Sequence, residues 1–273
     1  MLKRPIPSSG ELLPVVGCGT WQTFDVGENT SARAPLRDVL GALVEAGGSL
    51  IDSSPMYGTA EKVVGDLVTE ENLRAKTFIA TKVWTEGREA GAAQMARSAA
   101  LLKSDPVDLI QIHNLLDWKT HLRTLRTWKD ENRVRYLGIT HYTTSAHDEL
   151  AAVMRAEPVD FVQFNYALDD RAAENTLLPL AAERGVAVLI NRPLGKGALV
   201  RRLKNRKLPD FAAELGCTDW AGLALKYILA NEAVTCIIPA TRRSEHMRGN
   251  AKAGAGPLPD ADMRRRILEA AGV

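Results

Sequence analysis

The sequence predicts a single (β/α)₈ barrel, a TIM barrel of class α/β, in which eight parallel strands alternate with helices. Three observations support this prediction. The chain has 273 residues, close to the roughly 250 residues typical of one such barrel. Short apolar segments rich in β-branched residues alternate with longer segments of helical periodicity up to the end of the chain. No linker or block of charge interrupts this alternation, so we expect one domain over residues 1–273.

The strand candidates are mostly apolar at consecutive positions, as expected for parallel strands covered by helices on their outer face. They are Pro14–Gly19, Ser49–Ser53, Thr77–Val83, Val107–His113, Val134–Thr140, Phe161–Asn165, Val186–Asn191 and Thr235–Ile238. A doubly wound open sheet is the alternative. Such a sheet usually carries a GxGxxG motif directly after its first strand, and the segment Gly17–Gln22 lacks the third glycine. The closed barrel is therefore favoured.

Helical periodicity fills the segments between the strands, and it is clearest where Leu36, Val39, Leu40 and Leu43 recur before Gly47. The helix candidates are Ala34–Ala46, Ala60–Glu70, Gly91–Lys103, Lys119–Asn132, Ser145–Ala156, Ala172–Arg184, Asp219–Asn231 and Asp260–Ala271. Two segments lie outside this repeat. Residues 4–13 resemble an N-terminal β-hairpin, and residues 192–216 form a long loop after strand seven, where an insertion is more often functional than idle.

Composition excludes several classes of protein. The net charge is +2, from 35 basic and 33 acidic residues, and there is no broad basic face for nucleic acid. The 3 cysteines are far apart without CxxC spacing, which disfavours both a disulfide framework and a zinc site. No apolar segment approaches the roughly 18 residues that span a bilayer, and no apolar region follows the N-terminal basic residues. We expect a cytoplasmic protein without a membrane partner, monomeric or weakly oligomeric.

The candidate catalytic residues lie at the carboxyl ends of three consecutive strands, where barrel enzymes carry their active sites. Strand two ends in Asp52, with Tyr57 five positions further on, strand three ends in Lys82, and strand four ends in His113. Each has an ordinary explanation when taken alone: Asp52 as a helix cap, Lys82 reaching solvent, His113 half-buried, Tyr57 on the rim. Together they can converge on one small volume.

These residue types suit the protonation of a carbonyl oxygen. A neighbouring ammonium lowers the pKa of a phenol, and a carboxylate paired with that ammonium keeps it charged and in place. We therefore expect Lys82 to lower the pKa of Tyr57, Asp52 to hold Lys82, and His113 to orient the carbonyl or assist the proton step. The hydride must come from a cofactor, because no side chain supplies one.

The segments GCGTW, IDSSPMYG, TKVW and DLIQIHN, at these intervals, resemble the aldo-keto reductase superfamily, and the likeness runs from the N-terminal hairpin to IIPATRRSEHMRGN. The resemblance implies that Asp52, Tyr57, Lys82 and His113 form the catalytic tetrad, with Tyr57 as the general acid. It also implies that NAD(P)H lies extended across the barrel mouth without a Rossmann domain. The substrate would be a small carbonyl compound, an aldehyde or a ketone.

The same resemblance implies a set of cofactor-binding positions: Gly19, Thr20, Trp21, Asp52, Thr140, His141, Gln163, Asn191, Arg192, Pro193, Leu194, Lys196, Ala240, Thr241, Arg242, Arg243, His246 and Asn250. The chain departs from the family pattern at several of them. His141 stands where an asparagine is usual, and Asn191 replaces the aromatic residue that stacks on the nicotinamide. Arg192 and Lys196 either contact the pyrophosphate or are solvent-exposed charges of the long loop.

The adenosine end decides between NADPH and NADH. A common lysine of the family is replaced by Ala240 and a frequent arginine by His246, which leaves Arg242 and Arg243 for the 2′-phosphate. A predicted helix that opens here offers further backbone donors for an anion. NADPH is favoured, with NADH possible.

The substrate pocket would have walls of Trp21, Met56, Trp84 and Trp118, although Trp118 has an equally good explanation as packing at a helix start. The short tail after Pro259 predicts an open pocket of broad specificity. Two other functions stay open. Lys82 as a Schiff-base nucleophile would need to be neutral, and a regulatory barrel that senses redox state through bound NADPH would show little turnover.

Overall fold

Eight short parallel strands form the central sheet of the computed structural model, which describes residues 1–273. They are β3 (Cys18–Gly19), β4 (Leu50–Asp52), β5 (Phe78–Val83), β6 (Val107–His113), β7 (Val134–Thr140), β8 (Phe161–Asn165), β9 (Ala187–Asn191) and β10 (Cys236–Ile237). Each strand pairs with its neighbour in the chain. Parallel bridges from Val16 to Ile237 and from Gly19 to Ala240 close the sheet into the predicted barrel.

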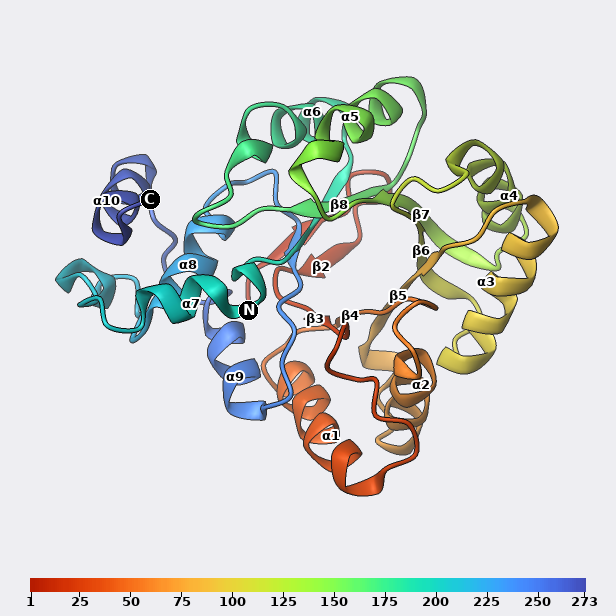
Figure 1. Ribbon diagram of the computed structural model, residues 1–273, viewed down its shortest axis with the longest axis horizontal. Coiled ribbons are helices and arrows are strands. Elements are labelled where there is room, and N and C mark those ends of the chain that lie inside the picture. The colour runs from red at the N-terminus through yellow and green to blue at the C-terminus, as the bar shows by residue number, and fades with distance from the viewer.

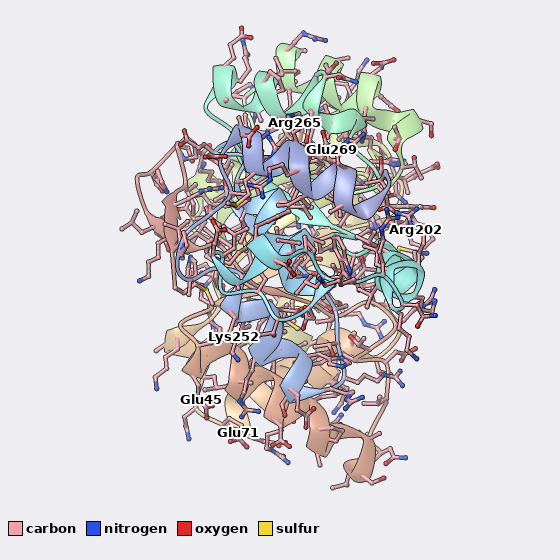
Figure 2. All side chains as sticks on the ribbon, turned by 90° about the vertical axis from the view of Figure 1, so that its left-hand side faces the viewer. Glu45, Glu71, Arg202, Lys252, Arg265 and Glu269 are labelled. Carbon is pink, nitrogen blue, oxygen red and sulfur yellow. The ribbon has the colours of Figure 1, made fainter.

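Helices surround the strands on all sides, as Figure 1 shows. Those of the repeat are α1 (Thr30–Glu45), α2 (Ala60–Glu70), α3 (Arg88–Leu102), α4 (Trp118–Asp130), α5 (His147–Ala156), α6 (Leu177–Arg184), α8 (Trp220–Leu229) and α9 (Ser244–Lys252). Their amphipathic sequences bury one face against the strands. The long loop after β9 carries α7 (Ala198–Leu203), and the chain ends in α10 (Ala261–Ala271). Both lie on one side of the ring, and Figure 2 shows this side with Arg202 on α7 and Arg265 on α10.

Helix boundaries differ from the predicted ones where a local cap decides them. Helix α1 begins at Thr30 rather than at Ala34, because the Asn29 side chain accepts a hydrogen bond from the backbone N–H of Ala32. The predicted helix Ala172–Arg184 divides into a 3₁₀ turn and α6, since Thr176 has an extended φ of −139°. None of the helices is both long enough and apolar enough to cross a membrane.

The lower half of the barrel interior is an apolar plug. One buried cluster contains Leu50, Phe78, Leu109, Tyr136 and Phe161, one from each of five neighbouring strands, and the aromatic rings of Tyr136 and Phe161 meet edge-on at 5.6 Å. The N-terminal hairpin, β1 (Lys3–Pro5) paired antiparallel with β2 (Leu12–Pro14), seals this end. Two of its residues join the same cluster: Ile6 and Leu13.

The upper half of the interior is polar. Side chains of a strand point to alternate faces, so the residue two positions beyond a buried interior residue also faces inward. Along β5 the inward-facing residues are Ala80 and then Lys82. Along β6 they are Leu109, Gln111 and His113. Strand β4 places Asp52 at the same level, two positions after Leu50. The ionisable strand ends predicted from the sequence therefore meet at the carboxyl end of the barrel.

Candidate active site

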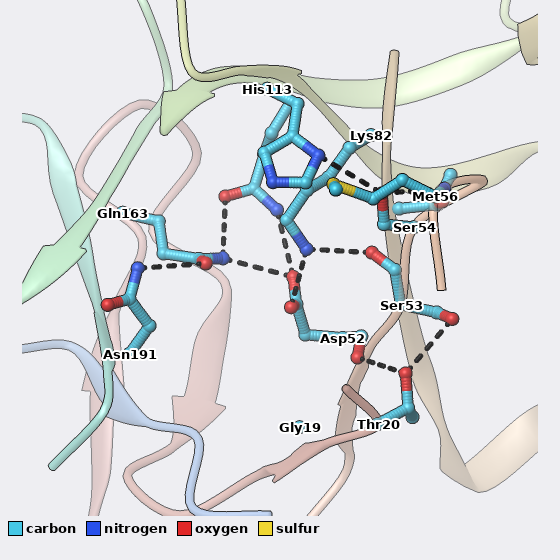
Figure 3. A network of polar contacts seen from close by, with 12 residues as sticks. Gly19, Thr20, Asp52, Ser53, Ser54, Met56, Lys82, His113, Gln163 and Asn191 are labelled. Atoms are coloured by element: carbon cyan, nitrogen blue, oxygen red, sulfur yellow. Dashed lines mark hydrogen bonds and ion pairs between the residues drawn. The ribbon is translucent and has the colours of Figure 1, made fainter. Parts of the chain in front are cut away.

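The structure brings Asp52, Tyr57, Lys82 and His113 together at the top of the interior. The Nζ atom of Lys82 lies 2.6 Å from Oδ2 of Asp52 and donates a second hydrogen bond to the Ser53 carbonyl at 2.7 Å (Figure 3). The same Nζ atom is 5.0 Å from the ring centroid of Tyr57. The rings of Tyr57 and His113 meet edge to face, with centroids 6.0 Å apart.

Lys82 and Asp52 form a buried ion pair, with exposed fractions of 1% and 3%. Burial lowers the pKa of the Lys82 ammonium, but the negative charge of Asp52 and that of an ionised Tyr57 outweigh burial and raise the pKa above its ordinary value. Lys82 is therefore protonated at neutral pH. A charged ammonium cannot attack a carbonyl carbon, so this environment disfavours a Schiff-base role.

The sequence-based expectation for the pKa of Tyr57 is wrong in its net direction. Burial raises the pKa of the Tyr57 phenol, and the Lys82 ammonium lowers it by less than burial raises it, so the pKa lies above its ordinary value. The sequence showed the ammonium but not the depth at which the ring sits. Tyr57 consequently keeps its proton at neutral pH, as a proton donor must.

His113 is neutral at physiological pH. Burial and the nearby Lys82 charge lower the pKa of its imidazole to about 3. Its Nδ1 atom lies 3.1 Å from the Ser54 hydroxyl, which orients the ring (Figure 3). Nε2 has no hydrogen-bond partner in the protein. A neutral imidazole can hydrogen-bond a carbonyl oxygen without adding a full positive charge.

A chain of amides next to the tetrad was only partly foreseen. Asp52 Oδ1 accepts hydrogen bonds from Nε2 of Gln111 and from Nε2 of Gln163, each at 3.0 Å. Gln163 Oε1 in turn accepts from Nδ2 of Asn191 at 3.3 Å (Figure 3). Gln163 and Asn191 were predicted from the sequence as site residues, whereas Gln111 was not. A signal existed, because Gln111 is the one uncharged polar residue inside an apolar strand, two positions before His113.

A cavity of about 1330 Å³ opens above the tetrad and extends toward α7 and α9. It is lined by most of the predicted site residues: Gly19, Thr20, Trp21, Asp52, Met56, Tyr57, His113, Thr140, Gln163, Asn191, Arg192, Pro193, Leu194, Lys196, Ala240, Thr241, His246 and Asn250. Position 19 requires glycine, because a Cβ atom there would approach the Ile238 carbonyl oxygen to 2.8 Å. The volume of the cavity exceeds the roughly 300–1,000 Å³ that is usual for small-molecule pockets.

Comparison with known proteins agrees with this architecture. Residues 15–267 match the profile of the Aldo/keto reductase family. The chain belongs to this family. Its members are NAD(P)H-dependent oxidoreductases, so the predicted superfamily and enzyme class are confirmed.

The relatives of this aldo/keto reductase include bacterial enzymes. It is 28% identical over 272 residues to the methylglyoxal reductase YeaE of Escherichia coli, covering 96% of this chain and 93% of that protein. An alignment of 330 positions gives 24% identity to an NADH-specific methylglyoxal reductase of Escherichia coli and covers 99% of each chain. An aldo-keto reductase of Klebsiella pneumoniae, crystallised in complex with NADPH, superposes with a TM-score of 0.81 at 22% identity, covering 98% and 94% of the two chains. The predicted barrel is confirmed.

This aldo/keto reductase does not bring every predicted residue to the cavity. Trp118 begins α4 and packs against the core outside the barrel. The ring of Trp84 lies at the rim, 6.4 Å from that of His113. His141 uses Nδ1 to accept the backbone N–H groups of Tyr142 and Thr143, so its side chain caps its own loop. The sequence could place these residues near strand ends but not orient their side chains.

The two arginines expected at the 2′-phosphate also point elsewhere. Arg242 donates to the backbone carbonyls of Gln22 and Thr23, at 2.7 and 3.2 Å, and so holds the loop after β3. Arg243 is exposed and its nearest acid is Glu245, at 3.7 Å. Neither lines the cavity, whereas His246 does.

Proposed function

We propose that this protein reduces aldehydes or ketones to alcohols with NADPH, and that Tyr57 is the proton donor. The observation that carries the proposal is the group formed by Tyr57, Lys82, Asp52 and His113, of which Tyr57, Asp52 and His113 line a large cavity. The names of the two Escherichia coli relatives, both methylglyoxal reductases, support a carbonyl substrate. The NADPH complex of the Klebsiella pneumoniae structure supports the cofactor.

The residues around the cavity fit a nicotinamide cofactor. The Oδ1 atoms of Asn191 and Asn114 are buried without a hydrogen-bond partner, and both residues line the cavity. A carboxamide NH₂ group would satisfy such an acceptor, because buried polar atoms are almost always paired. Asn191 and Gln163 would hold the carboxamide, while Lys196, His246 and the N-terminus of α9 would hold phosphates. When bound, NADPH supplies the hydride that no side chain can supply.

The protein's own residues would bind and protonate the carbonyl group. The Tyr57 hydroxyl and Nε2 of neutral His113 would both donate hydrogen bonds to the carbonyl oxygen. As negative charge develops on that oxygen, Tyr57 transfers its proton to it and the C=O group becomes a hydroxyl. Lys82 then stabilises the phenolate that remains, and Asp52 keeps Lys82 in place. A proton from solvent restores the phenol.

Turnover of simple aldehydes tests this proposal against the regulatory and Schiff-base alternatives. We expect the wild-type protein to consume NADPH, measured by its absorbance, with 4-nitrobenzaldehyde and with methylglyoxal. Tight NADPH binding without consumption on either aldehyde would favour a regulatory barrel. Borohydride trapping of an aldehyde on Lys82, detected by mass spectrometry, would contradict the assigned role of Lys82.

A further inference from the structure

Arg192 is a half-buried cation without an acidic partner. Its guanidinium lies 4.1 Å over the ring of Tyr142, and it forms no ion pair. Asp170 is the nearby carboxylate that acts electrostatically on Arg192, but both of its oxygens are hydrogen-bonded to other residues. Asp170 Oδ2 accepts from Asn165 at 2.5 Å, and Asp170 Oδ1 accepts from Thr144 at 3.2 Å. Guanidinium groups out of bulk water are normally paired with an anion. Arg192 is thus prepared for an anionic partner that the protein does not provide.

The backbone at Arg192 is held in an unusual conformation. Its φ is +52°, in the left-handed region that non-glycine residues rarely occupy. Strained residues of this kind concentrate at functional sites, where the surrounding structure maintains them. The preceding residue supplies that support here, since Nδ2 of Asn191 is bonded both to Gln163 and to the His141 carbonyl. This conformation holds Arg192 next to Asn191, the first residue of the hydrogen-bonded series Asn191, Gln163 and Asp52.

Arg192 lies at the tetrad end of the cavity. It lines the same cavity as Tyr57 and His113. Its positive charge is close enough to Tyr57 to lower the pKa of the phenol, although burial remains the dominant effect. Apolar and aromatic side chains line the cavity nearby, among them Met56 and Trp21. A carbonyl compound in contact with Tyr57 would therefore have apolar walls and one guanidinium within its surroundings.

We propose that Arg192 binds a carboxylate group of the substrate, so that oxo acids and carboxylated aldehydes are the preferred substrates. This inference rests on the proposed carbonyl reduction. The guanidinium fork matches a carboxylate with two parallel hydrogen bonds, and the Tyr142 ring supports one face of the guanidinium. The cofactor pyrophosphate is the competing partner, and the experiment separates the two.

Matched substrate pairs test the proposal. The first pair is 4-formylbenzoate and its methyl ester, and the second is 4-oxobutanoate and its methyl ester. Within each pair the aldehyde is the same and only the carboxylate differs. We expect the wild-type protein to have the higher kcat/KM for the carboxylate in at least one pair. Arg192→Gln should lower the carboxylate-to-ester ratio in that pair roughly 10- to 100-fold, as expected for loss of a charged hydrogen-bonded contact.

Arg202→Gln is the matched control, because it removes the same charge from α7 at a site away from the cavity. Arg202 is half exposed and pairs with Asp169 at 3.2 Å. This variant should keep the wild-type ratio. The proposal is overturned if the wild-type protein prefers the ester in both pairs. It is equally overturned if Arg192→Gln lowers both members of a pair by one factor together with NADPH affinity, which would assign Arg192 to the pyrophosphate.

A binding measurement keeps this test separate from that of the proposed function. Calorimetry with NADP⁺-loaded protein would compare the alcohol 4-(hydroxymethyl)benzoate with its methyl ester. We expect the wild-type protein to bind the carboxylate more tightly and Arg192→Gln to lose the difference. That result without turnover of any aldehyde would contradict the proposed reduction but support the anion site. Turnover of both esters and acids without a difference in binding would support the proposed reduction and contradict the anion site at Arg192.

Discussion

Removal of the Lys82 ammonium should destabilise the fold as well as impair the reaction. In Lys82→Met the methionine occupies a similar volume, but Asp52 remains as a carboxylate that is only 3% exposed. Breaking a buried ion pair by removing one partner typically costs about 3–5 kcal/mol. Here Gln111 and Gln163 still donate to Asp52 Oδ1, so we expect the lower end, about 3 kcal/mol of the free energy of unfolding.

Urea denaturation monitored by circular dichroism measures this loss. The double variant Lys82→Met/Asp52→Asn should recover part of it, because the unpaired charge is gone. Lys226→Met is the matched control, since Lys226 is also buried but its Nζ donates only to the carbonyls of Ala255 and Pro257, at 2.5 and 2.8 Å. It should cost less stability and leave turnover intact. Wild-type stability in Lys82→Met, or a further loss in the double variant, would refute the buried-pair reasoning.

The same variant shows whether Lys82 acts on Tyr57 or binds the cofactor. Lys82 does not line the cavity and its charge acts on Tyr57. Lys82→Met should therefore lower the rate of aldehyde reduction much more than it lowers NADPH affinity in a fluorescence titration. Loss of NADPH affinity with the rate preserved at saturating cofactor would make Lys82 a cofactor-binding residue.

Two further predictions concern the pKa of His113 and the hydrogen bonds of Arg242. The pKa of His113 is lowered to about 3 in the fold from about 6.5 in an unfolded chain, so its contribution to stability is complete above pH 6.5 and is lost progressively down to pH 3. The slope is about 1.4 kcal/mol per pH unit, and His113→Gln should reduce the pH dependence of the urea midpoint in this range. Arg242→Ala should weaken NADPH and NADH by similar factors, because Arg242 holds the loop that carries Trp21. A loss confined to NADPH would show that Arg242 reaches the 2′-phosphate.

The sequence could predict the strands and the tetrad because both depend on short-range pattern. Apolar runs define parallel strands, and the two-residue alternation within a strand decides which side chain faces inward. Lys82 and His113 each follow an interior residue by an even number of positions, and so does Asp52. Their meeting is a consequence of the parallel register, in which neighbouring strands end at one level.

Side-chain direction in the loops depends on distant parts of the chain and could not be predicted in this way. Arg242 follows β10 but turns to carbonyls about 220 positions earlier in the sequence. Trp118 is close to His113 in sequence, yet it packs into the outer core because α4 begins there. The pKa of Tyr57 depends on how deeply neighbouring loops bury the ring. Only the three-dimensional structure contains these contacts.

The central claim is that the Tyr57 hydroxyl donates the proton, and Tyr57→Phe tests it most directly. The change removes one oxygen and keeps the ring against Lys82 and His113. The control is Tyr136→Phe, which removes a partly buried hydroxyl that donates to Glu11 at the opposite end of the barrel. NADPH consumption with 4-nitrobenzaldehyde should fall by at least ~10² in Tyr57→Phe, with NADPH affinity retained, and should be unchanged in Tyr136→Phe. Turnover by Tyr57→Phe at the wild-type rate would contradict the account.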